Sequence, residues 1–113
     1  MSKFTVQGVQ GFTIDTLFQR LIIFGKEIKV FDAVSILFLE EHSGHTNSIL
    51  GVLLANEDYL ISFDNQKIVS RSRKDFKVEF EMFPRSPITT AVVMGDLVAG
   101  YSDIIIEIYI FNY

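Results

Sequence analysis

The chain repeats itself at an interval of about 40 residues, and this repeat limits its possible folds more than any other feature. Hydrophobic segments begin at Leu21, Leu60 and Leu97, spaced 39 and 37 residues apart. The segments between them recur at an offset of 40, pairing 36–41 with 76–81 and 48–54 with 88–94. A fixed period of this length is typical of folds built from stacked copies of one unit.

The segments within each period have the composition of short β-strands. Runs rich in Val, Ile and Phe recur from end to end, and no amphipathic stretch of helical length competes with them. Residues 76–83 alternate apolar and charged side chains, as a strand with one solvent-facing side does. Each period holds four such strands separated by turn residues, so the sequence predicts an all-β fold.

Composition excludes several classes of function. At 113 residues the chain has the size of one small domain, and 49% of it is apolar. The absence of Cys excludes disulfides, a thiolate nucleophile and Cys-ligated zinc. The net charge of -4 disfavours broad binding to nucleic acid. We see no secretory signal and no apolar run long enough to span a bilayer, so we expect an intracellular protein, nucleolar or cytoplasmic.

Four strands per period match one blade of a β-propeller of the WD type. The middle repeat contains the pair Gly44-His45, then Ser62 after a hydrophobic pair, then Asp64 at a tight turn. In these positions the chain resembles WD40 repeats. The resemblance implies that His45, Ser62 and Asp64 form a structural polar network. A catalytic triad is disfavoured because the sequence has neither a GxSxG turn nor an evident oxyanion site.

The resemblance divides the chain into blades at 1–33, 34–73 and 74–113, about two and three-quarter blades of four strands each. A propeller needs roughly four blades to close. We therefore expect an open segment, which is part of a larger propeller, completed by a partner, or an aberrant short member. The last strand has Glu107 as its only charge, which predicts a pairing edge for a partner strand or another copy. The edge residues are Ile104, Ile106, Ile108 and Ile110.

Two other clusters are candidates for binding sites. Glu40, Glu41, His42 and His45 include metal-ligand types, but two His in one loop without a second pair favour structural roles, so we predict neither a metal nor a cofactor. The basic cluster lies on the predicted turn before the outer strand. It suits a solvated turn, or else contact with RNA phosphate or an acidic partner. Its residues are Lys67, Arg71, Arg73 and Lys74.

These features predict a non-catalytic WD-repeat scaffold for protein–protein interactions in a multiprotein assembly. The order GKEIKVFD, ILFLEEH and DYLISFDNQKI further resembles the opening blades of the U3-associated WD-repeat proteins of the small-subunit processome, which implies ribosome biogenesis. The alternative is a compact, stand-alone β-barrel or sandwich that binds a small apolar ligand or lipid. An enzyme is not expected.

Overall fold

The structure, a computed structural model, describes residues 5–85, 87–94, 97–101 and 106–110. Within these residues, strands are the only regular secondary structure, so the expected all-β class is confirmed. The same part of the chain contains no helix long and apolar enough to cross a bilayer. The strands are β1 Gly11–Asp15, β2 Arg20–Phe24, β3 Ile28–Asp32, β4 Phe38–His42, β5 Gly51–Ala55, β6 Tyr59–Phe63, β7 Ile68–Ser72, β8 Val78–Met82, β9 Thr90–Met94, β10 Leu97–Tyr101 and β11 Ile106–Ile110.

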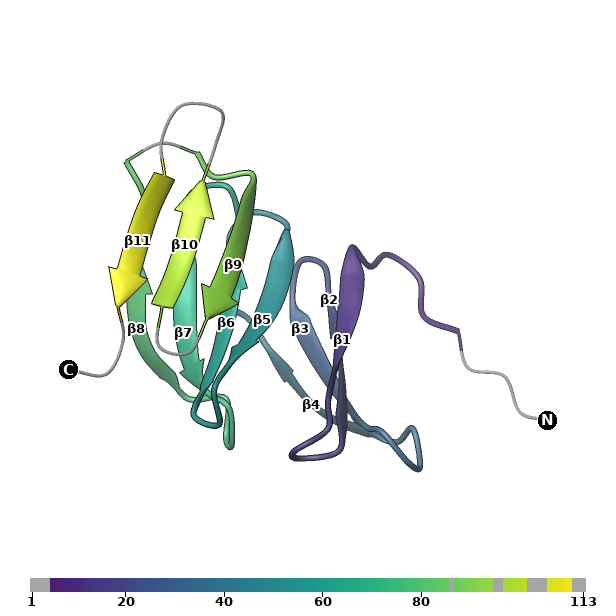
Figure 1. Cartoon of the computed structure of the whole chain (residues 1–113). Coiled ribbons are helices and arrows are strands. Elements are labelled where there is room, and N and C mark those ends of the chain that lie inside the picture. Colours follow the sequence, from purple (N-terminus) through teal and green to yellow (C-terminus); the bar gives the residue numbers. More distant parts are fainter. Residues whose placement is uncertain (1–4, 86, 95–96, 102–105, 111–113) are drawn as a thin grey trace.

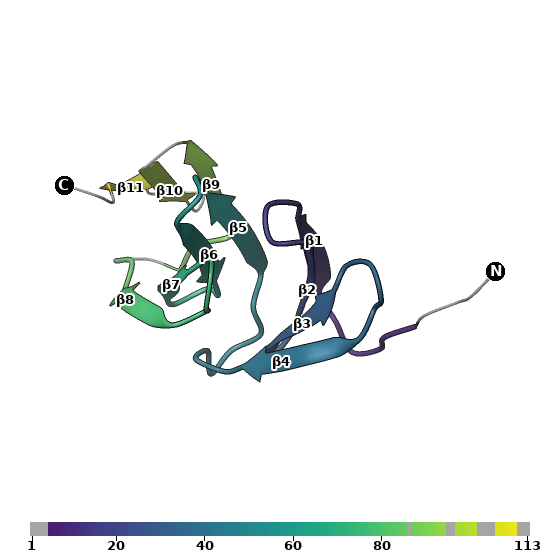
Figure 2. The same ribbon diagram turned by 90° about the horizontal axis from the view of Figure 1, so that it is seen from below.

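Successive strands pair antiparallel into three separate sheets (Figure 1). The first sheet has the order β1-β2-β3-β4, the second β5-β6-β7-β8, and the third β9-β10-β11. Strands β1, β5 and β9 lie next to one another, while the outer strands β4 and β8 lie away from them (Figure 2). The three sheets therefore pack face to face, with their first strands on the inside and the strands β4 and β8 on the outside.

The sheets are offset from the expected ranges 1–33, 34–73 and 74–113. Strands β4 and β8 open the second and third ranges, yet each is the outer strand of the preceding sheet. The reason is a short turn, closed by the hydrogen bond from Asp32 N–H to the Leu37 carbonyl and its counterpart from Ser72 to Lys77. Each turn folds the next strand back beside the one just completed.

The predicted strand at 76–83 is shorter than expected. Phe76 belongs to the turn before β8, has a φ of 64° and is almost fully buried. Ile36 occupies the same place before β4, with a φ of 60°. Positive φ is rare for bulky residues, so its recurrence in both turns marks a feature of the repeat. The turn conformation directs Phe76 into the core, which an alternating pattern alone does not reveal.

Two apolar cores hold the sheets together. The core between the first and second sheets contains Ile22, Phe24, Ile28, Val30, Ile49, Val52, Leu60 and Phe76. The core on the other side of the second sheet contains Ala55, Ile61, Phe63, Ile68, Ile88 and Ala91. The second sheet therefore buries apolar side chains on both faces, as an internal layer of a stack must.

Candidate functional site

His45, Ser62 and Asp64 lie in hydrogen-bond contact. The loop before β5 carries His45, strand β6 carries Ser62, and the turn after β6 carries Asp64. The imidazole Nδ1 lies 2.6 Å from Asp64 Oδ2, and Nε2 lies 2.8 Å from Ser62 Oγ. Asp64 Oδ1 also accepts hydrogen bonds from the N–H groups of Gln66 and Lys67, at 2.7 and 2.8 Å. The carboxylate thus fixes its own turn and the loop beside it.

The partners of His45 define its protonation. An ionised carboxylate only accepts hydrogen bonds, so Nδ1–H donates to Asp64 and Nε2 accepts the hydroxyl hydrogen of Ser62. Burial lowers the pKa of His45, and this effect outweighs the opposing influence of Asp64. The imidazole is therefore neutral at pH 7. Because the serine hydrogen is directed at a buried imidazole and the His45 side chain is inaccessible, the three residues have the arrangement of a structural network.

A buried ion pair joins the first two sheets. Asp15 at the end of β1 is fully buried, and Arg73 from the turn after β7 approaches its carboxylate. Nε of Arg73 lies 2.9 Å from Oδ2, and Nη2 lies 2.8 Å from Oδ1. Burial alone raises the pKa of Asp15, but the Arg73 hydrogen bonds and the N–H groups of Phe18 and Leu17 lower it below its ordinary value. The pair is a two-pronged, charge-assisted contact.

The expected basic surface is wrong for two of its four residues. Arg71 is buried in β7 and donates from Nη2 to the Ser43 carbonyl at 2.7 Å, while Arg73 is bound to Asp15. Lys67 Nζ lies 3.2 Å from Glu81 Oε1, and Lys74 is exposed. Both arginines are held by contacts within the chain, Arg71 by the Ser43 carbonyl and Arg73 by the Asp15 carboxylate. Neither offers an accessible guanidinium to RNA phosphate.

The two histidines of the metal-ligand type, His42 and His45, have different partners and do not converge on one site. His42 stacks on the Phe76 ring at a centroid distance of 5.0 Å, and its Nε2 lies 3.3 Å from Glu40 Oε1. The ring of His45 is fully engaged by Ser62 and Asp64. Among the described residues no group of three or more His, Cys, Asp or Glu could hold a metal ion.

Strand β11 lies at an edge of the third sheet, beside β10. It contains Ile106, Ile108 and Ile110, three of the residues expected to form a pairing edge. Ile104 lies outside the described residues. The position of the strand suits the expected pairing role, which stays a prediction.

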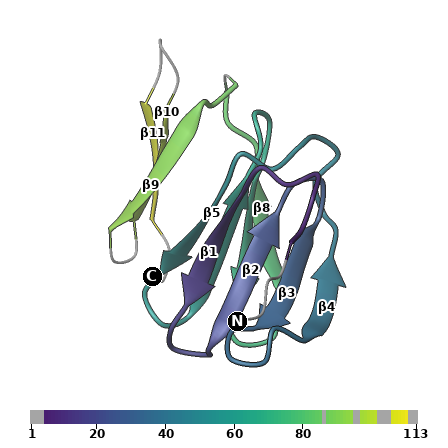
Figure 3. The same ribbon diagram turned by 90° about the vertical axis from the view of Figure 1, so that its right-hand side faces the viewer.

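One face of the first sheet is apolar and is exposed along β1. Cross-strand pairing places Phe12 opposite Ile23 and Ile14 opposite Leu21, so these four side chains share one face, here called the open face. Phe12 is 67% exposed and Ile14 is 53% exposed. Figure 3 looks onto this side of the molecule, with β1 to β4 in front of the second sheet.

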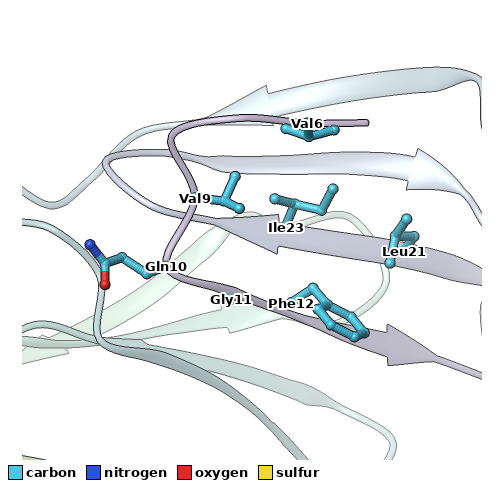
Figure 4. A pocket seen from close by; sticks show the side chains of 7 residues that line it. All are labelled: Val6, Val9, Gln10, Gly11, Phe12, Leu21 and Ile23. Atoms are coloured by element: carbon cyan, nitrogen blue, oxygen red, sulfur yellow. The ribbon is translucent and has the colours of Figure 1, made fainter. Parts of the chain in front are cut away.

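An apolar hollow of about 330 Å³ lies on the open face. Phe12, Leu21 and Ile23 line it from the strands, and Val6 and Val9 line it from the segment that precedes β1 (Figure 4). Sequence analysis missed this surface. The alternation of Phe12 and Ile14 with Gly11, Thr13 and Asp15 was its available signal.

Compared by sequence, the chain matches no family model and none of the curated proteins. Its structure is similar to the β-propeller domain of Cps50 (Swd1) from Myceliophteria thermophila, with a TM-score of 0.73 and 14% identity, over 95% of this chain and 40% of that one. It is also similar to the WD40 repeats of RRP9, with a TM-score of 0.71 and 14% identity, over 81% of this chain and 30% of that one. The fold is that of WD40 propeller blades.

The chain spans less than half the length of both WD40 structures. Its described residues form two four-stranded blades and three strands of a third, which confirms the expected two and three-quarter blades. The sheets do not close on themselves. The alternative of a compact barrel or sandwich is wrong, because each sheet is a separate WD40 blade with its strands in meander order.

Proposed function

We propose that this chain is a non-catalytic WD40 scaffold segment, which takes its place in a multiprotein assembly by having its open face covered by another sheet. The supporting observation is the repeat itself. Phe12, Ile14 and Leu21 on the open face correspond to Val52, Leu54 and Leu60 in the second sheet, at offsets of 40, 40 and 39.

The corresponding face of the second sheet is covered. Val52 and Leu60 are buried in the core against Ile22, Phe24 and Ile28 of the first sheet, and Leu54 packs on the same core. Phe12 and Ile14 are the corresponding apolar side chains of the first sheet, and they are exposed. This favours another apolar sheet as the partner that covers the open face. Exposed apolar surface of this kind is typical of interaction sites.

A small apolar ligand is the second candidate for the open face. The hollow there has a volume in the lower range of ligand sites and an apolar lining. However, Phe12 and Ile14 are more than half exposed, whereas ligand sites enclose most of their ligand. A broad, flat occupant accounts for both side chains better than a small molecule does.

The proposal is tested by replacing Phe12 and Ile14 together with Lys. Both side chains project from the surface, so the blade itself should fold. We expect the tagged wild-type chain, expressed in its native host, to sediment in a gradient with an assembly much larger than the free chain. The double variant should move to the position of the free chain, because two buried ammonium groups oppose the association.

Leu50→Lys is the control, since Leu50 is an exposed apolar residue outside the open face. It should sediment as the wild type does. A wild-type chain that sediments alone, or a Phe12→Lys, Ile14→Lys variant that stays in the assembly, would contradict the proposal. Binding of a fluorescent fatty acid that the double variant abolishes, without any assembly, would favour the ligand instead.

The finer proposal is an intracellular role in ribosome biogenesis, with a nucleolar rather than cytoplasmic place. It is supported by the resemblance of the chain's opening segments to processome WD-repeat proteins, and likeness to RRP9 at 14% identity supports the fold alone. Co-sedimentation of the wild-type assembly with pre-ribosomal RNA tests this proposal separately from the scaffold role.

A further inference from the structure

The outer rim of the first sheet carries a second apolar surface. Val34 and Leu37 lie in the turn before β4, and Phe38 and Leu39 begin the strand. Their exposed fractions are 78%, 66%, 55% and 51%. These four residues, here called the rim patch, lie close together in sequence. They belong to β4 and the turn before it, and β4 forms the edge of the first sheet opposite β1 (Figure 2).

The second sheet provides an internal comparison for the rim patch. Its turn before β8 has the same main-chain hydrogen bonds and the same positive φ at Phe76. The residues at the corresponding positions, 40 further along, are Lys74, Lys77, Val78 and Glu79. Three of these four are charged, as expected for a solvated turn. Because the backbone is the same, turn geometry does not explain why the first sheet exposes four large apolar side chains.

The rim patch adjoins an unpaired strand edge. Strand β4 pairs with β3 on one side, and among the described residues no strand pairs with its other side. An edge strand can accept an added strand through its main-chain groups, with neighbouring side chains selecting the partner. The rim patch thus combines a template for strand addition with apolar anchors.

Charge narrows the choice of occupant. Strand β4 continues from the apolar residues into Glu40 and Glu41. In an antiparallel pairing with β4 of a second copy centred on Glu40, the two Glu40 side chains would face each other and Leu39 would face Glu41. Like charges placed opposite each other oppose pairing, so self-association through this edge is disfavoured. A partner strand with basic residues is favoured.

We propose that the outer edge of β4 binds an extended segment of a protein partner in which apolar and basic residues alternate, through strand addition beside the rim patch. This inference rests on the scaffold function and assigns it a second surface. The two can fail separately, since the rim patch and the open face are altered by different substitutions.

The probe is a short fluorescein-labelled peptide in which Lys and Val alternate, compared with a peptide in which Glu replaces Lys. We expect the Lys peptide to give a saturable rise in anisotropy with the full chain and the Glu peptide to give none. The variant Leu37→Lys with Leu39→Glu introduces the residues found at the corresponding positions of the second sheet and keeps the net charge. It should bind the Lys peptide about tenfold more weakly or worse.

The matched control is Val78→Lys with Phe80→Glu on β8, another charge-neutral exchange at exposed apolar positions. It should bind as the wild type does, and melting temperatures establish that both variants fold. A second variant, Glu40→Gln with Glu41→Gln, should reduce the preference for the Lys peptide. Equal binding of both peptides, equal loss in the β8 control, or wild-type dimerisation that the rim variant abolishes would each overturn the proposal.

Discussion

Arg73, in the turn after β7, donates two hydrogen bonds to the carboxylate of Asp15 at the end of β1, from Nε to Oδ2 at 2.9 Å and from Nη2 to Oδ1 at 2.8 Å. The contact spans 58 residues of sequence and lies where two blades meet. Arg20 adds to the junction, because its Nη1 donates to the Arg73 carbonyl at 3.2 Å and its guanidinium lies 5.1 Å from the Phe76 ring centre. The junction between the blades therefore has a polar contact in addition to the apolar core.

Asp15→Asn should lower the free energy of unfolding by about 2 kcal/mol, because it removes the charged acceptor of a buried, two-pronged pair. Urea denaturation measures this change. Asp32→Asn is the matched control, since Asp32 also accepts two turn N–H groups, from Val34 and Ser35, but no arginine. A loss in Asp15→Asn no greater than in Asp32→Asn would show that the ion pair adds nothing to the turn.

His45→Ala should lower the free energy of unfolding by about 1 to 3 kcal/mol, because it leaves buried groups of Ser62 and Asp64 without their partner. Thermal unfolding measures the effect. Thr46→Ala, at the exposed neighbour of His45, should leave the melting temperature near that of the wild type. An unchanged melting temperature in His45→Ala would contradict the structural role.

The folded chain should lose stability as the pH falls below about 6.5, the ordinary pKa of histidine. Burial lowers the pKa of His45, so the unfolded chain binds this proton more readily than the folded chain does. The contribution of neutral His45 to the free energy of unfolding is therefore fully present above pH 6.5 and is lost progressively below it. Unfolding measured at pH 7.5 and pH 5.5 should show a smaller difference for His45→Gln than for the wild type, and an equal difference would refute this.

Replacing Ile108 and Ile110 with Lys should abolish any strand pairing beside β11, because charged side chains on an edge strand oppose it. Strands β5 to β8 should stay folded. Hydrogen exchange measured on the associated wild-type chain should show slow amides in β11, and sedimentation should show the variant dissociated. A stable wild-type monomer with β11 amides as fast as those of a free tail would disprove the pairing role.

Much of the fold follows from the repeat in the sequence. The spacing of Leu21, Leu60 and Leu97 marks β2, β6 and β10, and the offset of 40 locates the other strands to within a few residues. The contacts of His45 could also be anticipated, because its partners lie on one β-hairpin within 19 residues. Short sequence separation and fixed hairpin geometry make such contacts predictable.

Contacts between blades could not be predicted in the same way. Asp15 and Arg73 are brought together by the stacking of two sheets, and no local pattern specifies the partner of either residue. Arg71 was misplaced because a buried arginine and a solvated one look alike in a sequence. The alternating sequence pattern predicts Phe76 as the first residue of a strand. Its positive φ places it in the turn instead, and no feature of the sequence pattern reports that angle.

The most direct test of the scaffold account is an experimental structure of this chain within the assembly purified from its native host. The account predicts a β-sheet packed on Phe12 and Ile14, stacked as the first sheet stacks on Val52 and Leu60 of the second. Phe12 and Ile14 facing solvent in that assembly, or covered only by a small molecule, would contradict it.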